Sequence, residues 1–196
     1  MSNIIVLGAG MVGSTMAIDM AKNHSVSITD FNKSALDKAV KKCNNLTPIV
    51  LDVTDKAALQ KTINPFDLVI CAVPGFLGFE TLKSIIEAEK NVIDISFFPE
   101  NALELHELAQ QKNVTAIVDC GVAPGMDNII LGYYNEQLQL TDFECLVGGL
   151  PKVKKWPFCY KAPFSPIDVI EEYTRPARYV ENGEMITKEA LTDCEY

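Results

Sequence analysis

Short apolar, β-branched runs alternate with helix-period segments along most of this chain. The runs are continuous rather than alternately polar and apolar, which is typical of strands buried on both faces of a parallel sheet. They are IIVL, VSIT, PIVL, DLVICAV, NVIDI and VTAIV, at residues 4–7, 26–29, 48–51, 67–73, 91–95 and 114–118. Six such βα repeats predict an α/β fold, a doubly wound parallel sheet with helices on both sides.

The pattern changes after Thr141. FECLVGGLP, residues 143–151, is predicted to be a strand outside the βα rhythm, and a proline-rich aromatic loop follows it. Ser165 and Asp168 form a capping-box-like start for a helix, and an Asn-Gly turn separates two final strands. We expect residues 1–140 to form a Rossmann domain and residues 141–196 to begin a smaller α+β substrate or dimerisation domain, incomplete in this chain.

Charge and cysteine content narrow the class of partner. A net charge of −9 argues against nucleic acid and anionic membranes, and favours a small-molecule partner. Six cysteines without a CxxC pair, and a start without signal-peptide features, predict reduced thiols and a cytoplasmic protein. No apolar run approaches the roughly 18 residues of a membrane-spanning helix. No metal site is indicated.

The first predicted strand ends in a glycine-rich turn. Of its three glycines, the first allows a tight turn, the second lets the backbone approach a pyrophosphate, and the third permits close packing of helix on strand. Asp30 ends the second strand, where an acidic residue binds the adenosine ribose. Because Asp30 would repel a 2′-phosphate and no Arg follows it, the sequence predicts NAD rather than NADP. The cofactor residues predicted at this turn are Gly8, Gly10, Met11, Val12 and Gly13.

Ligands of a doubly wound sheet lie across the carboxyl ends of its strands. Asp52, after the third strand, is either an adenine-side residue or a helix cap. The remaining cofactor residues predicted at this edge are Ala72, Val73, Pro74, Cys120 and Gly121. The break at 118–132 (VDCGVAPGMDNIILG) is either part of the nicotinamide site or a domain hinge.

Two carboxylates at the same edge are the candidate catalytic groups. Asp94 and Asp119 follow the fifth and sixth runs, where either is suited to orient a substrate amine or accept its proton. The alternative for both is capping and turn hydrogen bonding. Ser96, just beyond Asp94, is a predicted substrate contact.

The motifs DCGVAPGMDNIILGYY, VGGLP and YKAPFSPIDVIEEYTRPARYVENGE resemble those of the saccharopine dehydrogenase-like family across essentially the whole chain. The resemblance implies reversible hydride transfer between a nicotinamide cofactor and a carbon bearing an amine or imine, usually in lysine metabolism. It also implies that family members continue beyond the last residue of this chain. Ala123 and Ile167 stand where saccharopine-forming relatives tend to carry an acidic residue and an arginine, so the pattern is most similar to the lysine 6-dehydrogenase branch.

An α-amino acid substrate also needs a partner for its carboxylate. Arg175 and Arg178, the only arginines of the sequence, are candidates, because a guanidinium matches a carboxylate. Tyr160 and Lys161, in the proline-rich loop, are candidates to close over the substrate. An ordinary surface or interdomain ion pair is the alternative.

The leading hypothesis is an NAD-dependent oxidoreductase acting on a carbon–nitrogen bond of lysine, saccharopine or a related amino acid. The alternative is a non-catalytic NAD(H) sensor in which the loop at 156–166 binds a protein partner. In either case we expect further sequence or a second copy of the chain to cover the open side of the second domain, and we expect a homo-oligomer, in the simplest form a dimer.

Overall fold

The computed structural model of the chain describes residues 1–148, 150–157, 159–161 and 165–192. Two compact units divide at Val147, Met1–Val147 and Gly148–Tyr196, and each is described by itself. The first unit carries the sheet. Among the described residues, no helix is long and apolar enough to cross a membrane.

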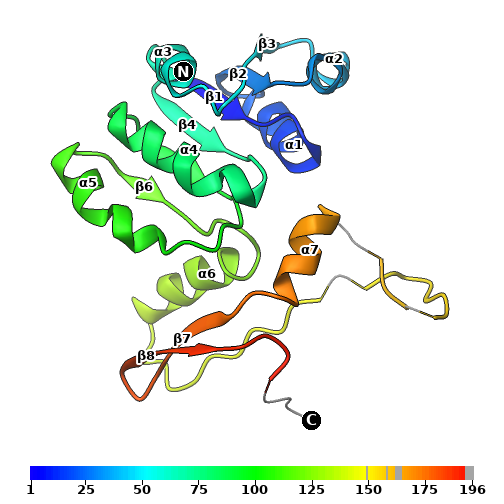
Figure 1. Cartoon of the computed structure of the whole chain (residues 1–196), viewed down its shortest axis with the longest axis vertical. Helices are drawn as coiled ribbons and strands as arrows, with labels where there is room; N and C mark the ends of the chain where they lie inside the picture. The colour runs from blue at the N-terminus through cyan, green and yellow to red at the C-terminus, as the bar shows by residue number, and fades with distance from the viewer. Residues whose placement is uncertain (149, 158, 162–164, 193–196) are drawn as a thin grey trace. The chain divides into compact units, whose positions relative to one another are not determined.

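Every one of the six predicted runs overlaps a strand of one parallel sheet (Figure 1). The strand order is β3-β2-β1-β4-β5-β6, so the chain reverses its direction of winding beside β1. The strands are β1 Asn3–Leu7, β2 Ser25–Asp30, β3 Leu46–Val50, β4 Leu68–Cys71, β5 Val92–Asp94 and β6 Ala116–Ile117. The predicted doubly wound Rossmann sheet is confirmed.

Helices cover both faces of the sheet, since alternate residues of each buried strand point to opposite sides. Ile4 and Val6 of β1 pack in one apolar cluster with α1 and α2, whereas Ile5 and Leu7 pack in another with α3, α4 and α5. The helices of this unit are α1 Met11–Met20, α2 Lys33–Lys42, α3 Lys56–Ile63, α4 Gly75–Glu87, η1 Ala102–Leu105, α5 His106–Gln111 and α6 Met126–Asn135. Two-sided burial explains why the strands are continuous apolar runs.

The second unit contains one helix, α7 Pro166–Glu172, and an antiparallel hairpin of β7 Ala177–Glu181 and β8 Glu184–Lys188 among its described residues. Asn182 and Gly183 both have positive φ at the turn, as the Asn-Gly pair predicts.

Local expectations failed at three positions. Residues 143–148 form no strand, and Gly149 lies outside the described residues. Thr54, which precedes DKAALQ in the sequence, is predicted to start α3, but the cap is Asp55, whose side chain accepts a hydrogen bond from Ala58 N. Ser165 stands at the N-cap of α7, but its side chain forms no cap hydrogen bond. The cap types are recognisable in sequence, but the residue that turns its oxygen inward depends on local backbone angles.

Candidate functional site

The first glycine turn joins β1 to α1 and is tightly packed except at Gly10. Gly8 has φ of +101°, and a Cβ there would meet the carbonyl oxygen of Ala72. A Cβ on Gly13 would meet the carbonyl oxygen of Gly8. Nothing lies within 4 Å of the place where a Cβ on Gly10 would be. Packing therefore requires Gly8 and Gly13, whereas Gly10 leaves the backbone open to a ligand.

The start of α1 adds an anion-binding element to this turn. Gly10 is the N-cap and makes no side-chain cap hydrogen bond. Met11 and Val12 follow with side chains that are 66% and 47% exposed, so the first turn of the helix is accessible. Uncapped amides and the helix dipole favour negative charge at this point. The turn fits the pyrophosphate of a dinucleotide.

Asp30 ties the end of β2 to the glycine turn. Its Oδ2 accepts a hydrogen bond from Ala9 N at 2.8 Å, and its Oδ1 accepts one from Asn32 N at 2.8 Å. Asn32 is in turn the N-cap of α2, with its side chain accepting from Ser34 N. Both oxygens of Asp30 are thus engaged by backbone amides, which spread its negative charge over the turn.

A groove of about 250 Å³ lies between the glycine turn and α2, and we call it the α2 groove. Its lining residues are Ala9, Gly10, Met11, Ser14, Asn32, Ala35, Lys38, Ala39 and Lys42. A second groove, of about 360 Å³, lies between the start of α3 and α4. It is lined by Val53, Thr54, Lys56, Phe76, Leu77, Glu80, Thr81 and Ser84.

Asp52 lies between β3 and α3. Its Oδ1 accepts hydrogen bonds from the backbone N and the hydroxyl of Thr54, and these bonds lower the pKa of Asp52. This is a turn interaction, and the helix cap is Asp55. Asp52 is not among the residues that line the neighbouring groove, so its contact with adenine stays a prediction.

The central strand ends meet at one edge of the sheet, as predicted. Ala72 N donates to Leu7 O at 2.8 Å, which places the segment after β4 against the glycine turn. Val73 is buried and Pro74 is exposed, so the segment leads from the core to the surface as α4 begins. Cys120 N donates to Asp94 O at 3.1 Å, which joins the ends of β6 and β5.

Asp94 is fully buried at this edge. Its Oδ1 accepts from Ser96 N at 2.6 Å, and its Oδ2 has no hydrogen-bond partner among the described residues. Burial is the main cause that raises the pKa of Asp94 from 3.8 to about 6. The thiol of the neighbouring Cys71 lies 3.7 Å from the Ser96 hydroxyl, and burial raises the pKa of the Cys71 thiol well above its ordinary value. Asp94 and Ser96 therefore form a buried, hydrogen-bonded turn at this edge of the sheet.

Asp119 differs from Asp94 in being exposed, and it has a positive φ of +56° at the end of the sixth run. The next residue, Cys120, is half-buried, and its pKa is raised by burial and then by Asp94 and Asp119. Of the two candidate catalytic carboxylates, Asp119 is the one accessible to a small molecule.

Within the break at 118–132, residues 121–125 form a closed turn that leads into α6. Gly121 N donates to Pro124 O, and Met126 N donates to Gly121 O, both at 3.0 Å. Gly125 has φ of +140°, and a Cβ there would meet the Gly121 carbonyl oxygen, so this glycine serves the turn itself. Asp127 Oδ1 accepts from Gly125 N at 2.8 Å and completes the closure. Gly121 is exposed, but a Cβ there would meet the Pro124 carbonyl oxygen, so this glycine also serves the turn.

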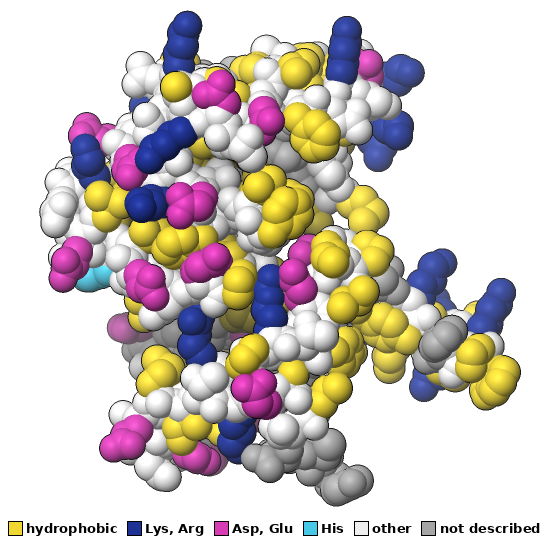
Figure 2. Space-filling model, viewed as in Figure 1, with side chains coloured by type: hydrophobic (Ala, Val, Ile, Leu, Met, Phe, Trp, Pro, Cys, Tyr) yellow, Lys and Arg dark blue, Asp and Glu magenta, His cyan; other side chains and the backbone are white. Residues whose placement is uncertain are grey.

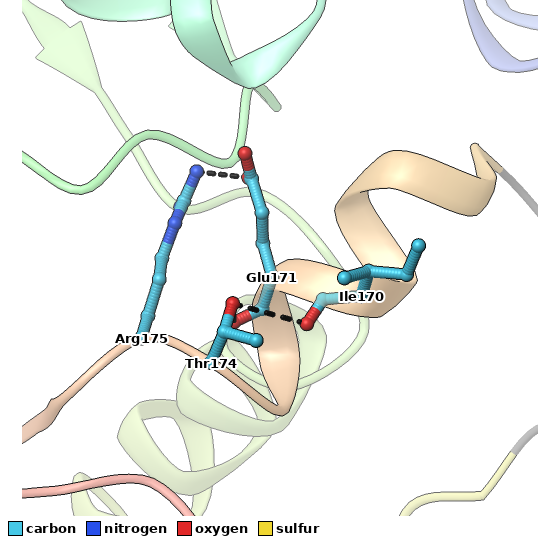
Figure 3. A network of polar contacts seen from close by, with 4 residues as sticks. All are labelled: Ile170, Glu171, Thr174 and Arg175. Atoms are coloured by element: carbon cyan, nitrogen blue, oxygen red, sulfur yellow. Dashed lines mark hydrogen bonds and ion pairs between the residues drawn. The ribbon is translucent and has the colours of Figure 1, made fainter.

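The predicted carboxylate-binding residues belong to the second unit. Arg175 forms an ion pair with Glu171 one turn earlier in α7, as Figure 3 shows. Arg178 lies on β7, and Tyr160 and Lys161 lie in the described stretch 159–161 of the proline-rich loop. Phe158 and residues 162–164 of that loop lie outside the described residues. The ion pair of Arg175 is the alternative that the sequence left open.

Two residues that help to form the turn and the groove carried no distinct sequence signal. Asp127 is an ordinary first-turn acid of α6 in sequence, and Lys38 is one of several lysines of α2. The one usable sequence signal for Lys38 is its spacing along α2, which places it on the helix face that lines the α2 groove. Within the described part of the chain, no group of three or more His, Cys, Asp or Glu is arranged to hold a metal ion.

Two family models match successive parts of the chain. Residues 4–117 match the saccharopine dehydrogenase NADP binding domain, and residues 121–195 match the saccharopine dehydrogenase C-terminal domain. The chain is 26% identical over 195 residues to saccharopine dehydrogenase [NADP(+), L-glutamate-forming] of Schizosaccharomyces pombe, covering 95% of this chain and 43% of that protein. It is 24% identical over 214 residues to α-aminoadipic semialdehyde synthase of Arabidopsis thaliana, covering 94% of this chain and 20% of that protein. The chain thus spans less than half the length of these relatives.

The fold matches a solved structure over a similar range. Apo saccharopine dehydrogenase (L-Glu forming) of Saccharomyces cerevisiae superposes with a TM-score of 0.71 at 23% identity, over 96% of this chain and 44% of that one. At this identity the likeness shows the fold alone. The resemblance to the lysine 6-dehydrogenase branch stays a prediction, since these relatives carry other names.

The predicted preference for NAD over NADP is wrong. The family model is that of an NADP binding domain, and the fungal relatives are named as NADP(+) enzymes. The structure gives the physical reason why Asp30 misled. Its two oxygens accept bonds from Ala9 and Asn32, so the carboxylate serves the glycine turn, and its presence does not decide which cofactor binds.

Proposed function

The chain belongs to the saccharopine dehydrogenase family, and we propose that it binds NADP(H) at the first glycine turn and takes part in hydride transfer at a carbon–nitrogen bond of an amino acid. The observation that carries this proposal is Gly10, which is open to a ligand between two glycines that packing holds in place. Bound NADP(H) supplies the hydride chemistry, and the protein supplies binding, orientation and proton transfer.

In this proposal, different residues at the carboxyl edge of the sheet bind the pyrophosphate, border the nicotinamide and accept the substrate proton. The first turn of α1, with Met11 and Val12, binds the pyrophosphate, and the segment from Ala72 to Pro74 and Gly121 border the nicotinamide. Asp119 is the proton acceptor for the substrate amine, because it is exposed where Asp94 is buried. Asp94 positions Ser96 and Cys120 through its hydrogen bonds.

The substrate class follows from the family rather than from a pocket. We propose an α-amino acid with a primary or secondary amine, of the lysine or saccharopine type. Domain roles follow in the same way, with residues 1–140 for the nucleotide and residues 141–196 for the substrate. A homodimer and a cytoplasmic location stay predictions, for light scattering and cell fractionation to test.

The test is NADP(+) reduction with a panel of amino acids, which includes lysine and saccharopine. We expect reduction with at least one of them, and a loss of about 100-fold in kcat for Asp119→Asn with an unchanged dissociation constant for NADPH. Asp142→Asn, an exposed acid of the same unit, is the charge-matched control. Tight NADPH binding with no reduction by any panel member would contradict the enzymatic role and favour the sensor.

A further inference from the structure

On the α2 side, the α2 groove is lined by two lysines, two alanines and Asn32. Asn32, Ala35, Lys38 and Lys42 recur every three or four residues, so they share one face of α2. Ala35 and Ala39 are short, which leaves space between the two lysines and the glycine turn. Figure 2 shows basic side chains gathered over α2.

Nothing negative lines this groove. Asp37 of the same helix is exposed and is not among the lining residues. Within the described part of the chain, neither Lys38 nor Lys42 forms an ion pair or a hydrogen bond with another side chain. In a protein of net charge −9, two lysines without acidic partners facing one groove favour an anionic ligand.

The groove lies where the adenosine end of the cofactor belongs. Gly10 and Asn32 are both lining residues, and Asn32 lies two residues after Asp30, the end of β2, beyond which the ribose of a bound dinucleotide lies. Lys38 and Lys42 line the same groove as Gly10, so both lysines border the space beside the glycine turn. Asp30 is tied to the glycine turn by two amide bonds.

We propose that Lys38, assisted by Lys42, binds the 2′-phosphate of NADP(H) in the α2 groove and so determines the cofactor specificity of this chain. The inference rests on the proposed function, since it needs the dinucleotide on the glycine turn. Specificity then comes from the second turn of α2 rather than from the residue that ends β2. Lysine suits this task as a compact charge for a phosphate.

The experiment measures dissociation constants of NADPH and NADH by nucleotide fluorescence, with 2′,5′-ADP and 5′-ADP as competitors. The variants are Lys38→Gln, Lys42→Gln and, as a matched control, Lys41→Gln, which lies on the same helix but does not line the groove. We expect Lys38→Gln to weaken NADPH and 2′,5′-ADP about tenfold or more, with NADH and 5′-ADP changed less than about twofold. Lys42→Gln should have a smaller effect of the same kind.

The outcomes separate the two proposals. Equal NADPH affinity in wild type and Lys38→Gln, or equal losses in Lys38→Gln and Lys41→Gln, would overturn the assignment while leaving the nucleotide site intact. Failure of the wild type to bind either dinucleotide would overturn the proposed function and the assignment together. Because all three lysines are exposed, unchanged thermal unfolding is expected to show that the variants fold.

Discussion

The two glycine turns at the carboxyl edge of the sheet are built in different ways. The first, Gly8 to Gly13, is held by backbone packing against Ala72, just after β4, and leads into α1, which buries Gly13 and Ala17. The second, Gly121 to Gly125, is closed by its own hydrogen bonds and leads into α6, which buries no residue. The first turn is therefore part of the core, whereas the second is a local structure that Cys120 joins to Asp94 at the end of β5.

The largest expected effect is at the packed glycine of the first turn. Gly13→Ala places a Cβ against the Gly8 carbonyl, and we expect a loss of about 3 kcal/mol in the free energy of unfolding, measured with urea. Gly132→Ala, at a helical position with nothing within 4 Å, is the control and should be neutral or slightly stabilising. A stability for Gly13→Ala equal to that of the control would show that the first turn is not part of the core.

A second effect comes from Asp94, the buried acid at the end of β5 to which Cys120 and the second turn are joined. The pKa of Asp94 is raised from 3.8 to about 6, so the folded state holds this proton more tightly than the unfolded chain does. Its contribution to stability is fully present below about pH 4 and is lost as pH rises to about 6, a change of roughly 2–3 kcal/mol. Urea unfolding as a function of pH should show this decline in wild type.

Asp94→Asn removes the titrating group and keeps an oxygen for the Ser96 amide. The pH-dependent decline between about pH 4 and 6 should therefore be absent in this variant. If the free energy of unfolding of Asp94→Asn declines with pH as steeply as that of wild type, another group causes the decline, and the titration of Asp94 does not affect stability.

The second turn itself should break locally. Gly125→Ala forces an L-residue to φ of +140° and crowds the Gly121 carbonyl. We expect faster hydrogen exchange at the Met126 and Asp127 amides, with only about 1 kcal/mol lost in global stability because α6 contributes no buried residue. Loss of global stability as large as that of Gly13→Ala would remove the distinction between the turns.

The smallest effect concerns the carboxylate that closes the second turn. Asp127→Ala removes the acceptor for Gly125 N and should cost about 1 kcal/mol, whereas Asp127→Asn retains an acceptor oxygen and should restore most of it. Exchange rates of the Gly125 amide measure the difference. Identical rates in the two variants would mean that this bond does not hold the turn.

The sequence predicted what depends on local pattern and burial. The six strands, the glycine turn after β1 and the Asn-Gly hairpin all follow from periodicity or from glycine geometry, and all are present. Family membership was also predicted correctly from the motifs around 119–126.

Side-chain partners were predicted less well, because they depend on which way a polar group turns. Asp30 was predicted to decide the cofactor, but its oxygens accept bonds from two backbone amides, and its contact with a ribose stays a prediction. Asp94 and Asp119 look alike in sequence, yet one is buried beside Cys71 and the other is exposed. The strand expected at 143–151 was inferred from residue preference, and preference alone does not supply a pairing partner.

We propose that the first turn is an open binding site for NADP(H) on a rigid packed base, and the variant Gly10→Ala is the sharpest test of this site. A methyl group at Gly10 meets no atom within 4 Å, so it should leave thermal unfolding unchanged while blocking close approach of the pyrophosphate. We predict that NADPH fluorescence titration gives at least about a tenfold weaker affinity for Gly10→Ala than for Gly132→Ala. Equal NADPH affinity in the two variants would contradict the account.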